Sequence, residues 1–73
     1  MTPDDFNRLI GQRIRRQRRI LGLTQADLAS AVGVRFQQIQ KYECAAASMS
    51  AARVVQIARA LNLPVSQLFD GLA

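Results

Sequence analysis

The fold of this chain is decided by residues 22–43, which read GLTQADLASAVGVRFQQIQKYE. Thr24 and Asp27 have the spacing of a capping box, so a helix is expected to begin at Thr24. Gly33 is expected to end that helix, because glycine adopts the positive φ that other residues resist. A second helix is expected over residues 35–43. The stretch therefore predicts two short helices separated by a tight glycine turn.

The second of these helices has an apolar face and a polar face. At about 100° per residue, Ile39 and Tyr42 lie together and are expected to face the core, with Phe36 and Glu43 on their flank. The opposite side carries amides and an ammonium group: Gln37, Gln38, Gln40 and Lys41. Glutamine can form paired hydrogen bonds with the edge of adenine, and lysine can reach the acceptors of guanine. This polar face fits either the reading of bases in a DNA major groove or a plain solvated surface.

A long helix is expected before this stretch, over residues 3–21. Thr2 can cap it, Pro3 fits its first position, and Gly22 ends it. Its apolar face is formed by Phe6, Ile10, Ile14, Gln17 and Leu21, and Arg18 lies at the edge of that face. The residues that point away from it are Arg15, Arg16 and Arg19. These arginines face either the phosphates of a bound nucleic acid or only solvent.

Two more helices are expected after the central stretch. Residues 44–49 read as a loop, and Ser50 can cap a helix over residues 51–61. The inward side of that helix is formed by Val54, Ile57, Ala58 and Leu61. Asn62 can end it in a left-handed conformation, and a short helix over residues 64–69 packs back through Leu68 and Phe69 before Gly71. Five short helices with short connections predict an all-α orthogonal bundle, a single domain over residues 1–73.

Composition narrows the class of partner. The chain has 73 residues, 49% of them hydrophobic, and ten Lys and Arg against five Asp and Glu, for a net charge of +5. Such a balance favours a nucleic acid, then an acidic membrane surface, over an inert basic surface. The absence of histidine and the single cysteine argue against a metal site and against Ser-His or Cys-His catalysis. We therefore expect no enzyme, no cofactor and no small-molecule ligand; without a membrane span or signal peptide, a cytoplasmic location is expected.

The chain resembles the XRE family of helix-turn-helix proteins, which includes the phage repressors and Cro proteins. The resemblance rests on the pattern Gly22-Leu23-Thr24-Gln25, Leu28-Ala29, Gly33-Val34, Ile39 and Tyr42-Glu43, and covers residues 9–71. It implies a compact five-helix, lambda-repressor-like domain that binds double-stranded DNA as a homodimer, with the helix over residues 35–43 in the major groove.

The resemblance also implies roles for single residues. Gln25 matches a residue that binds a phosphate and braces the recognition helix, at a helix N-terminus suited to anions. The positions that meet bases are matched by Phe36, Gln37, Gln38 and Lys41. Arg18 and Glu43 match a partly buried ion pair, and both are therefore predicted to be structural.

Several residues depart from the family pattern. Arg35 stands where a capping Ser or Thr is usual, and it contacts either a phosphate or base, or only solvent. Phe36 lies either against a thymine methyl group or under the helix. The loop over residues 44–48 lacks the usual glycine and cations, so Ala45 is expected to carry the strain of the helix end and backbone contact is expected to be weaker. Cys44 is either a redox switch in a dimer or an ordinary small residue.

The sequence thus predicts a repressor-like transcriptional regulator that binds an inverted-repeat operator as a homodimer. The dimer surface is expected at the C-terminus, through Val65, Leu68, Phe69 and Leu72. The sequence is compatible with a phage-type repressor, a restriction-modification controller or an antitoxin. No separate effector domain is expected within these 73 residues. The alternative is a protein-interaction module or antitoxin-type partner-binding protein that keeps the fold without binding DNA.

Overall fold

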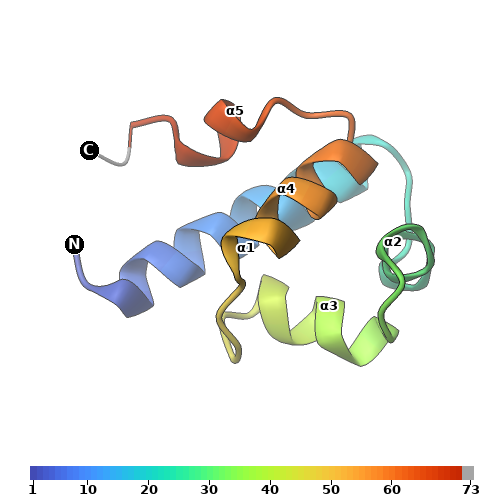
Figure 1. The fold of residues 1–73 in the computed structure, drawn as a ribbon, viewed down its shortest axis with the longest axis horizontal. Helices are drawn as coiled ribbons and strands as arrows, with labels where there is room; N and C mark the ends of the chain where they lie inside the picture. Colours follow the sequence, from blue (N-terminus) through green and yellow to red (C-terminus); the bar gives the residue numbers. More distant parts are fainter. Residues whose placement is uncertain (72–73) are drawn as a thin grey trace.

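A computed structural model describes residues 1–71 and contains five helices, with no strand in that range. They are α1 (Pro3–Ile20), α2 (Gln25–Val32), α3 (Phe36–Glu43), α4 (Ala51–Ala60) and α5 (Val65–Phe69). In Figure 1, α1 runs across the back with α4 in front of it, α3 lies below, α2 closes the right-hand end, and α5 lies above. The predicted all-α fold is confirmed, and the helices begin and end within one residue of the expected positions.

Side-chain caps start three of the helices. Thr2 and Asp5 form a capping box on α1, Thr24 and Asp27 form one on α2, and the Ser50 hydroxyl accepts the Arg53 N–H at the start of α4. In the second box, the Thr24 N–H donates to Asp27 at 2.8 Å and the Asp27 N–H donates to the Thr24 hydroxyl at 3.0 Å. The pKa of the Asp27 carboxyl is held below its ordinary value, mainly by the hydrogen bond from the Thr24 backbone and next by the Thr24 side chain. The caps explain why the helix starts were readable from the sequence.

The ends of α1 to α4 share one motif. One residue just past the end of each helix has a positive φ: Gly22 (71°), Gly33 (74°), Ala45 (62°) and Asn62 (55°). The residue that follows each of these donates its N–H back across the last turn, as from Val34 to the carbonyl of Ala29 at 3.0 Å. Both features define the Schellman motif. The expectation that Ala45 carries the strain of the α3 end is confirmed by its left-handed conformation.

The core lies between the five helices: α2 packs on α3 and α4, α1 packs on α3 and α5, and α4 packs on α5. Its fully buried side chains are mostly aliphatic: Ile10, Ile14, Leu28, Ile39, Ile57, Leu61 and Leu68. Gly11 brings α1 against the end of α3, because a Cβ at this position would clash with the carbonyl oxygen of Tyr42 and lie 2.9 Å from that of Glu43. The spacing between α1 and α3 therefore depends on a glycine in the middle of a helix.

Two predictions about apolar residues are wrong. Leu21 does not join the buried face of α1: it caps the helix and is 43% exposed. Leu68 is 0% exposed, which confirms that it packs back into the core and contradicts its place on a dimer surface. Val65 and Phe69 are half-buried, with the Phe69 ring stacked on Phe6 at 5.7 Å between centroids, and Leu72 lies outside the described residues. Among the described helices, none has the length and hydropathy needed to cross a membrane.

Candidate nucleic-acid interface

The two faces of α3 are separated as the sequence predicted. Ile39, Tyr42 and Glu43 are buried against the rest of the bundle. Gln37, Gln40 and Lys41 are exposed, and Gln38 is half-buried at the edge. Phe36, at the first position of the helix, is 48% exposed, so it does not fold under α3 as core. The outward side of α3 therefore presents amides, an ammonium group and one aromatic ring to solvent.

The connection between α2 and α3 fixes how α3 is presented. Gly33 reverses the chain in the left-handed conformation, and the half-buried Val32 and Val34 pack against the core on either side of it. α3 then starts at Arg35 without a side-chain cap; the Arg35 carbonyl accepts the Gln38 N–H at 3.0 Å. Backbone geometry thus replaces the missing Ser or Thr cap, and the exposed Arg35 side chain takes no part in starting the helix.

A buried ion pair joins α1 to the end of α3. Arg18 Nε donates to Glu43 Oε2 at 2.7 Å, and Arg18 Nη2 donates to Glu43 Oε1 at 3.0 Å. Arg18 Nη1 also donates to the Leu23 carbonyl at 2.8 Å, across the α1–α2 turn. The hydrogen bonds to Glu43 raise the pKa of the Arg18 guanidinium, against the opposing effect of burial. The charge of Glu43 is thus matched inside the fold by Arg18.

Gln25 extends this network to the start of α2. Its Nε2 donates to Glu43 Oε1 at 3.2 Å, so the first residue of α2 is tied to the last residue of α3. An amide nitrogen has two hydrogens, and one of them remains for a further acceptor. The contact with Glu43 is the kind of brace that the family resemblance implies for Gln25, and its phosphate contact stays a prediction.

Surface hollows flank α3 on both sides. One, of about 240 Å³, is lined by Arg15, Gln25, Gln40, Glu43 and Cys44. The other, of about 460 Å³, is lined by Val34, Arg35, Gln37, Gln38, Lys41, Tyr42 and Arg53. Cys44 is exposed, and its thiol donates to the Lys41 carbonyl at 3.7 Å. The recognition side chains predicted from the sequence thus share one surface with the arginines of α1 and α4.

Sequence reasoning missed Arg53. Its Nη1 donates to the Val32 carbonyl at 3.2 Å and to Gln56 Oε1 at 3.0 Å, which holds the guanidinium beside the α2–α3 turn and next to Arg35 and Lys41. The sequence does show a basic residue in the first turn of α4. Its place beside the α2–α3 turn depends on how α4 packs against α2, and the sequence pattern does not predict that packing.

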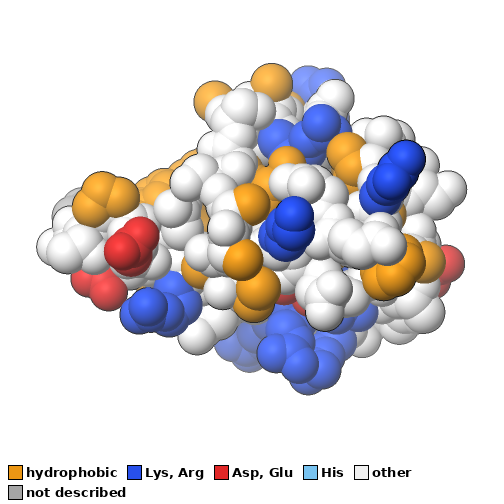
Figure 2. All heavy atoms as spheres, turned by 90° about the horizontal axis from the view of Figure 1, so that it is seen from below, with side chains coloured by type: hydrophobic (Ala, Val, Ile, Leu, Met, Phe, Trp, Pro, Cys, Tyr) orange, Lys and Arg blue, Asp and Glu red, His pale blue; other side chains and the backbone are white. Residues whose placement is uncertain are grey.

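Charge is distributed unevenly over this side of the molecule. Figure 2 shows the molecule from below, the side on which α3 lies: Lys and Arg side chains gather along one edge and stand at the centre, while Asp and Glu lie mostly at the ends. A surface of this kind attracts a polyanion. Within residues 1–71, no cluster of three or more His, Cys, Asp or Glu side chains could hold a metal ion.

Known proteins are similar to this chain in both sequence and fold. A family model described as Helix-turn-helix matches residues 14–68. An uncharacterised transcriptional regulator in the ATPase CF(0) region of Rhodospirillum rubrum is 48% identical over 63 residues, which are 86% of this chain and 58% of that protein. An uncharacterised HTH-type transcriptional regulator of Sinorhizobium medicae is 41% identical over 68 residues, which are 93% of this chain and 49% of that protein. The chain therefore spans about half the length of these relatives.

Solved structures agree with this fold. The restriction-modification controller protein C.AhdI from Aeromonas hydrophila superposes with a TM-score of 0.82 at 29% identity, over 89% of this chain and 97% of that one. The clp gene regulator ClgR from C. glutamicum superposes with a TM-score of 0.84 at 22% identity, over 88% of this chain and 83% of that one. The chain belongs to the XRE-type helix-turn-helix family, a family of DNA-binding transcriptional regulators rather than of enzymes.

Proposed function

We propose that this chain is the DNA-binding part of a sequence-specific transcriptional regulator and that α3 enters the major groove of double-stranded DNA. The observation that carries the proposal is the exposed side of α3, where Gln37 and Lys41 stand outward on a helix whose other side is locked into the core. A glutamine amide and a lysine ammonium group can distinguish base pairs by their hydrogen-bonding patterns in the major groove. Phe36 adds an apolar surface for a thymine methyl group.

The same proposal assigns contacts to the remaining predicted residues. Gln25, at the start of α2, binds a backbone phosphate with the amide hydrogen that Glu43 does not use. Arg35 and the half-buried Gln38 contact the DNA from the two sides of the outward face. Arg18 and Glu43 hold α3 in place and contact no base.

We further propose that the regulator acts as a homodimer on an inverted-repeat operator, in a repressor-like manner and in the cytoplasm. A two-fold dimer would place two copies of α3 about 34 Å apart, one turn of DNA. The likeness to a restriction-modification controller supports a regulator of this general type. Of the dimer surface predicted from the sequence, Val65 and Phe69 stay candidates, because both are half-buried on α5.

The test is selection of DNA sites from a random pool with this chain, repeated across salt concentrations. The proposal expects an inverted repeat to be enriched, with affinity that falls steeply as salt rises. Enrichment of single half-sites would overturn the dimer and leave DNA reading intact. If no sequence is enriched at any salt concentration, the proposal is wrong.

One observation favours a second candidate, a protein-interaction module on the same fold. The loop after α3, residues 44–49, reads CAAASM and carries no charge with which to hold a DNA backbone. If this second candidate is correct, no DNA sequence should be enriched from the pool, and a protein partner should bind the folded chain.

A further inference from the structure

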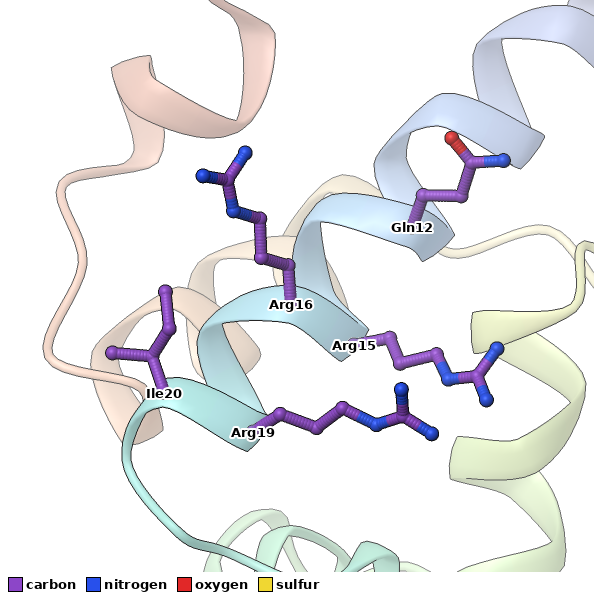
Figure 3. A pocket seen from close by; sticks show the side chains of 5 residues that line it. All are labelled: Gln12, Arg15, Arg16, Arg19 and Ile20. Atoms are coloured by element: carbon purple, nitrogen blue, oxygen red, sulfur yellow. The ribbon is translucent and has the colours of Figure 1, made fainter.

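Two arginines of α1 extend toward the recognition helix. Figure 3 shows the side chains of Arg15 and Arg19 lying one turn apart and reaching in the same direction, toward α3. Arg16 points in the other direction, toward α5. It lines the hollow along α1 together with Arg15 and Arg19, and it also lines a second hollow with Leu63 and Gln67. Arg15 and Arg19 therefore differ from Arg16 in the direction of their guanidinium groups.

The surroundings leave these charges uncompensated. The ion pairs found among residues 1–71 are Arg8 with Asp5 and Arg18 with Glu43, and neither includes Arg15 or Arg19. Like charges one helical turn apart repel each other, so the pair is unfavourable for the folded chain by itself. An anion placed between the two guanidinium groups would remove that repulsion.

Arg15 joins the hollow that it shares with Arg19 to a second hollow beside α3, which Arg19 does not line and which is suited to a phosphate. The other walls of the hollow beside α3 are the start of α2 at Gln25 and the end of α3 at Gln40 and Cys44. Glu43 also lines it, but its carboxylate already accepts bonds from Arg18 and Gln25. The N–H groups in the first turn of a helix have no partners inside the helix, and here the Thr24 hydroxyl covers that of Asp27. Positive charge and the start of α2 thus meet at one place beside α3.

We propose that Arg15 and Arg19 form an α1 clamp that binds backbone phosphates of the DNA strand running past the C-terminal end of α3. The inference rests on the proposed function, and it assigns the phosphate contacts to α1 in place of the uncharged loop over residues 44–49. Arginine suits this role, because its guanidinium group can bind two phosphate oxygens at once. The backbone contact missing from the loop is thereby supplied from the other side of the hollow.

The test compares Arg15→Gln, Arg19→Gln and the double variant with Arg16→Gln as the matched control. Binding to the selected operator and to a scrambled duplex is measured by fluorescence anisotropy over about 50 to 200 mM salt. Each lost phosphate contact should reduce the slope of log affinity against log salt by about 0.9. Clamp variants should lose the same factor in affinity for both duplexes, with the preferred sequence unchanged, whereas Arg16→Gln should keep the wild-type slope. Circular dichroism of each variant checks that the fold is retained.

The outcomes separate the two proposals. If the unmodified chain binds DNA and the double variant keeps its salt slope, the α1 clamp is wrong and DNA recognition stands. An equal loss from Arg16→Gln also overturns the clamp, because net charge alone would then explain the effect. A wild-type chain that binds neither duplex overturns the proposed function and the clamp with it.

Discussion

Arg18 and Glu43 lie 25 residues apart in the chain, and two hydrogen bonds of 2.7 and 3.0 Å join their charged groups. The two side chains are 9% and 3% exposed, so solvent screens the pair little. The contact ties the last turn of α1 to the last residue of α3. Gln25 reaches the same carboxylate, and the orientation of both helices of the motif therefore depends on it.

Removing one member of this pair should destabilise the fold. Glu43→Ala leaves the Arg18 charge buried without a partner. A guanidinium group does not lose its proton in proteins, so the buried charge cannot be relieved in that way. The expected loss in free energy of unfolding is about 3–5 kcal/mol, measured by urea denaturation. The double variant R18M/E43L should lose less than Glu43→Ala, because no lone charge remains. A Glu43→Ala chain of wild-type stability with altered base preference would show that Glu43 is a reader.

Gly11→Ala should also be destabilising, for a steric reason. The added Cβ would meet the carbonyl oxygens of Tyr42 and Glu43, which belong to the backbone and cannot rotate away. Overpacking of this kind costs about 1–3 kcal/mol, although alanine is the better helix former. Thermal unfolding measures the effect, and Gln12→Ala, at the exposed neighbouring position, is the control. Equal stability of the two variants would mean that α1 and α3 can separate at little cost.

Ala45→Gly should stabilise the chain. Ala45 ends α3 with φ 62°, where a residue with a Cβ is strained by about 1–2 kcal/mol and glycine is not. The gain in free energy of unfolding should be about 1 kcal/mol after glycine's greater freedom in the unfolded chain is counted. The reverse change at the equivalent place in α2, Gly33→Ala, should destabilise by a similar amount. No gain from Ala45→Gly would mean that the end of α3 relaxes when DNA is absent.

Gln37→Ala should change base preference without unfolding the chain. The side chain is exposed on α3, so its truncation removes no core contact. Discrimination at one base position of the operator should fall by about 1–3 kcal/mol, as measured with a panel of singly substituted duplexes. Gln12→Ala, an exposed glutamine of α1, should leave every position unchanged. An equal loss of affinity for every duplex would instead show that Gln37 contacts the DNA backbone and not a base.

Stability should fall in acid through the helix caps. The pKa values of Asp5 and Asp27 are lowered in the folded chain, chiefly by the backbone hydrogen bonds of Thr2 and Thr24. A lowered folded-state pKa stabilises the fold above the unfolded value, and this contribution is lost as the pH falls through the folded value. Both groups have an ordinary pKa of 3.8, so the loss belongs below that pH. Thermal unfolding from pH 6 to pH 2 should show a shallower decline in the D5A/D27A chain, and parallel curves would contradict the assignment.

The sequence predicted the helices well because their limits are local. Capping boxes and left-handed ends each involve residues within one turn of each other, and both can be read from spacing. The buried and exposed faces of α3 could be predicted for the same reason, because they depend only on the helical spacing of its residues. Pairing of Arg18 with Glu43 was reached through family resemblance, since residues 25 apart have no shared period.

What the sequence did not predict concerns contacts between distant segments. Arg13 Nη1 donates to the Leu68 carbonyl at 3.0 Å, and Gln17 Nε2 donates to the Leu61 carbonyl at 3.3 Å. The first bond holds α5 on α1, and the second holds the end of α4 on α1. Leu68 was predicted both to pack back on the bundle and to lie on a dimer surface, and its burial in α5 confirms only the first prediction. Contacts with bases and phosphates stay predictions for six residues, which are Gln25, Arg35, Phe36, Gln37, Gln38 and Lys41.

The stacking of Phe6 on Phe69 has a practical consequence. It holds the first turns of α1 beside α5, at the end of the molecule remote from α2 (Figure 1). A small dye or a short affinity tag attached near either of these helices would project from that end, beside the proposed dimer surface of Val65 and Phe69, and leave α3 uncovered. Labelled versions of the chain can therefore be made for single-molecule tracking on DNA, with the label attached away from the recognition helix.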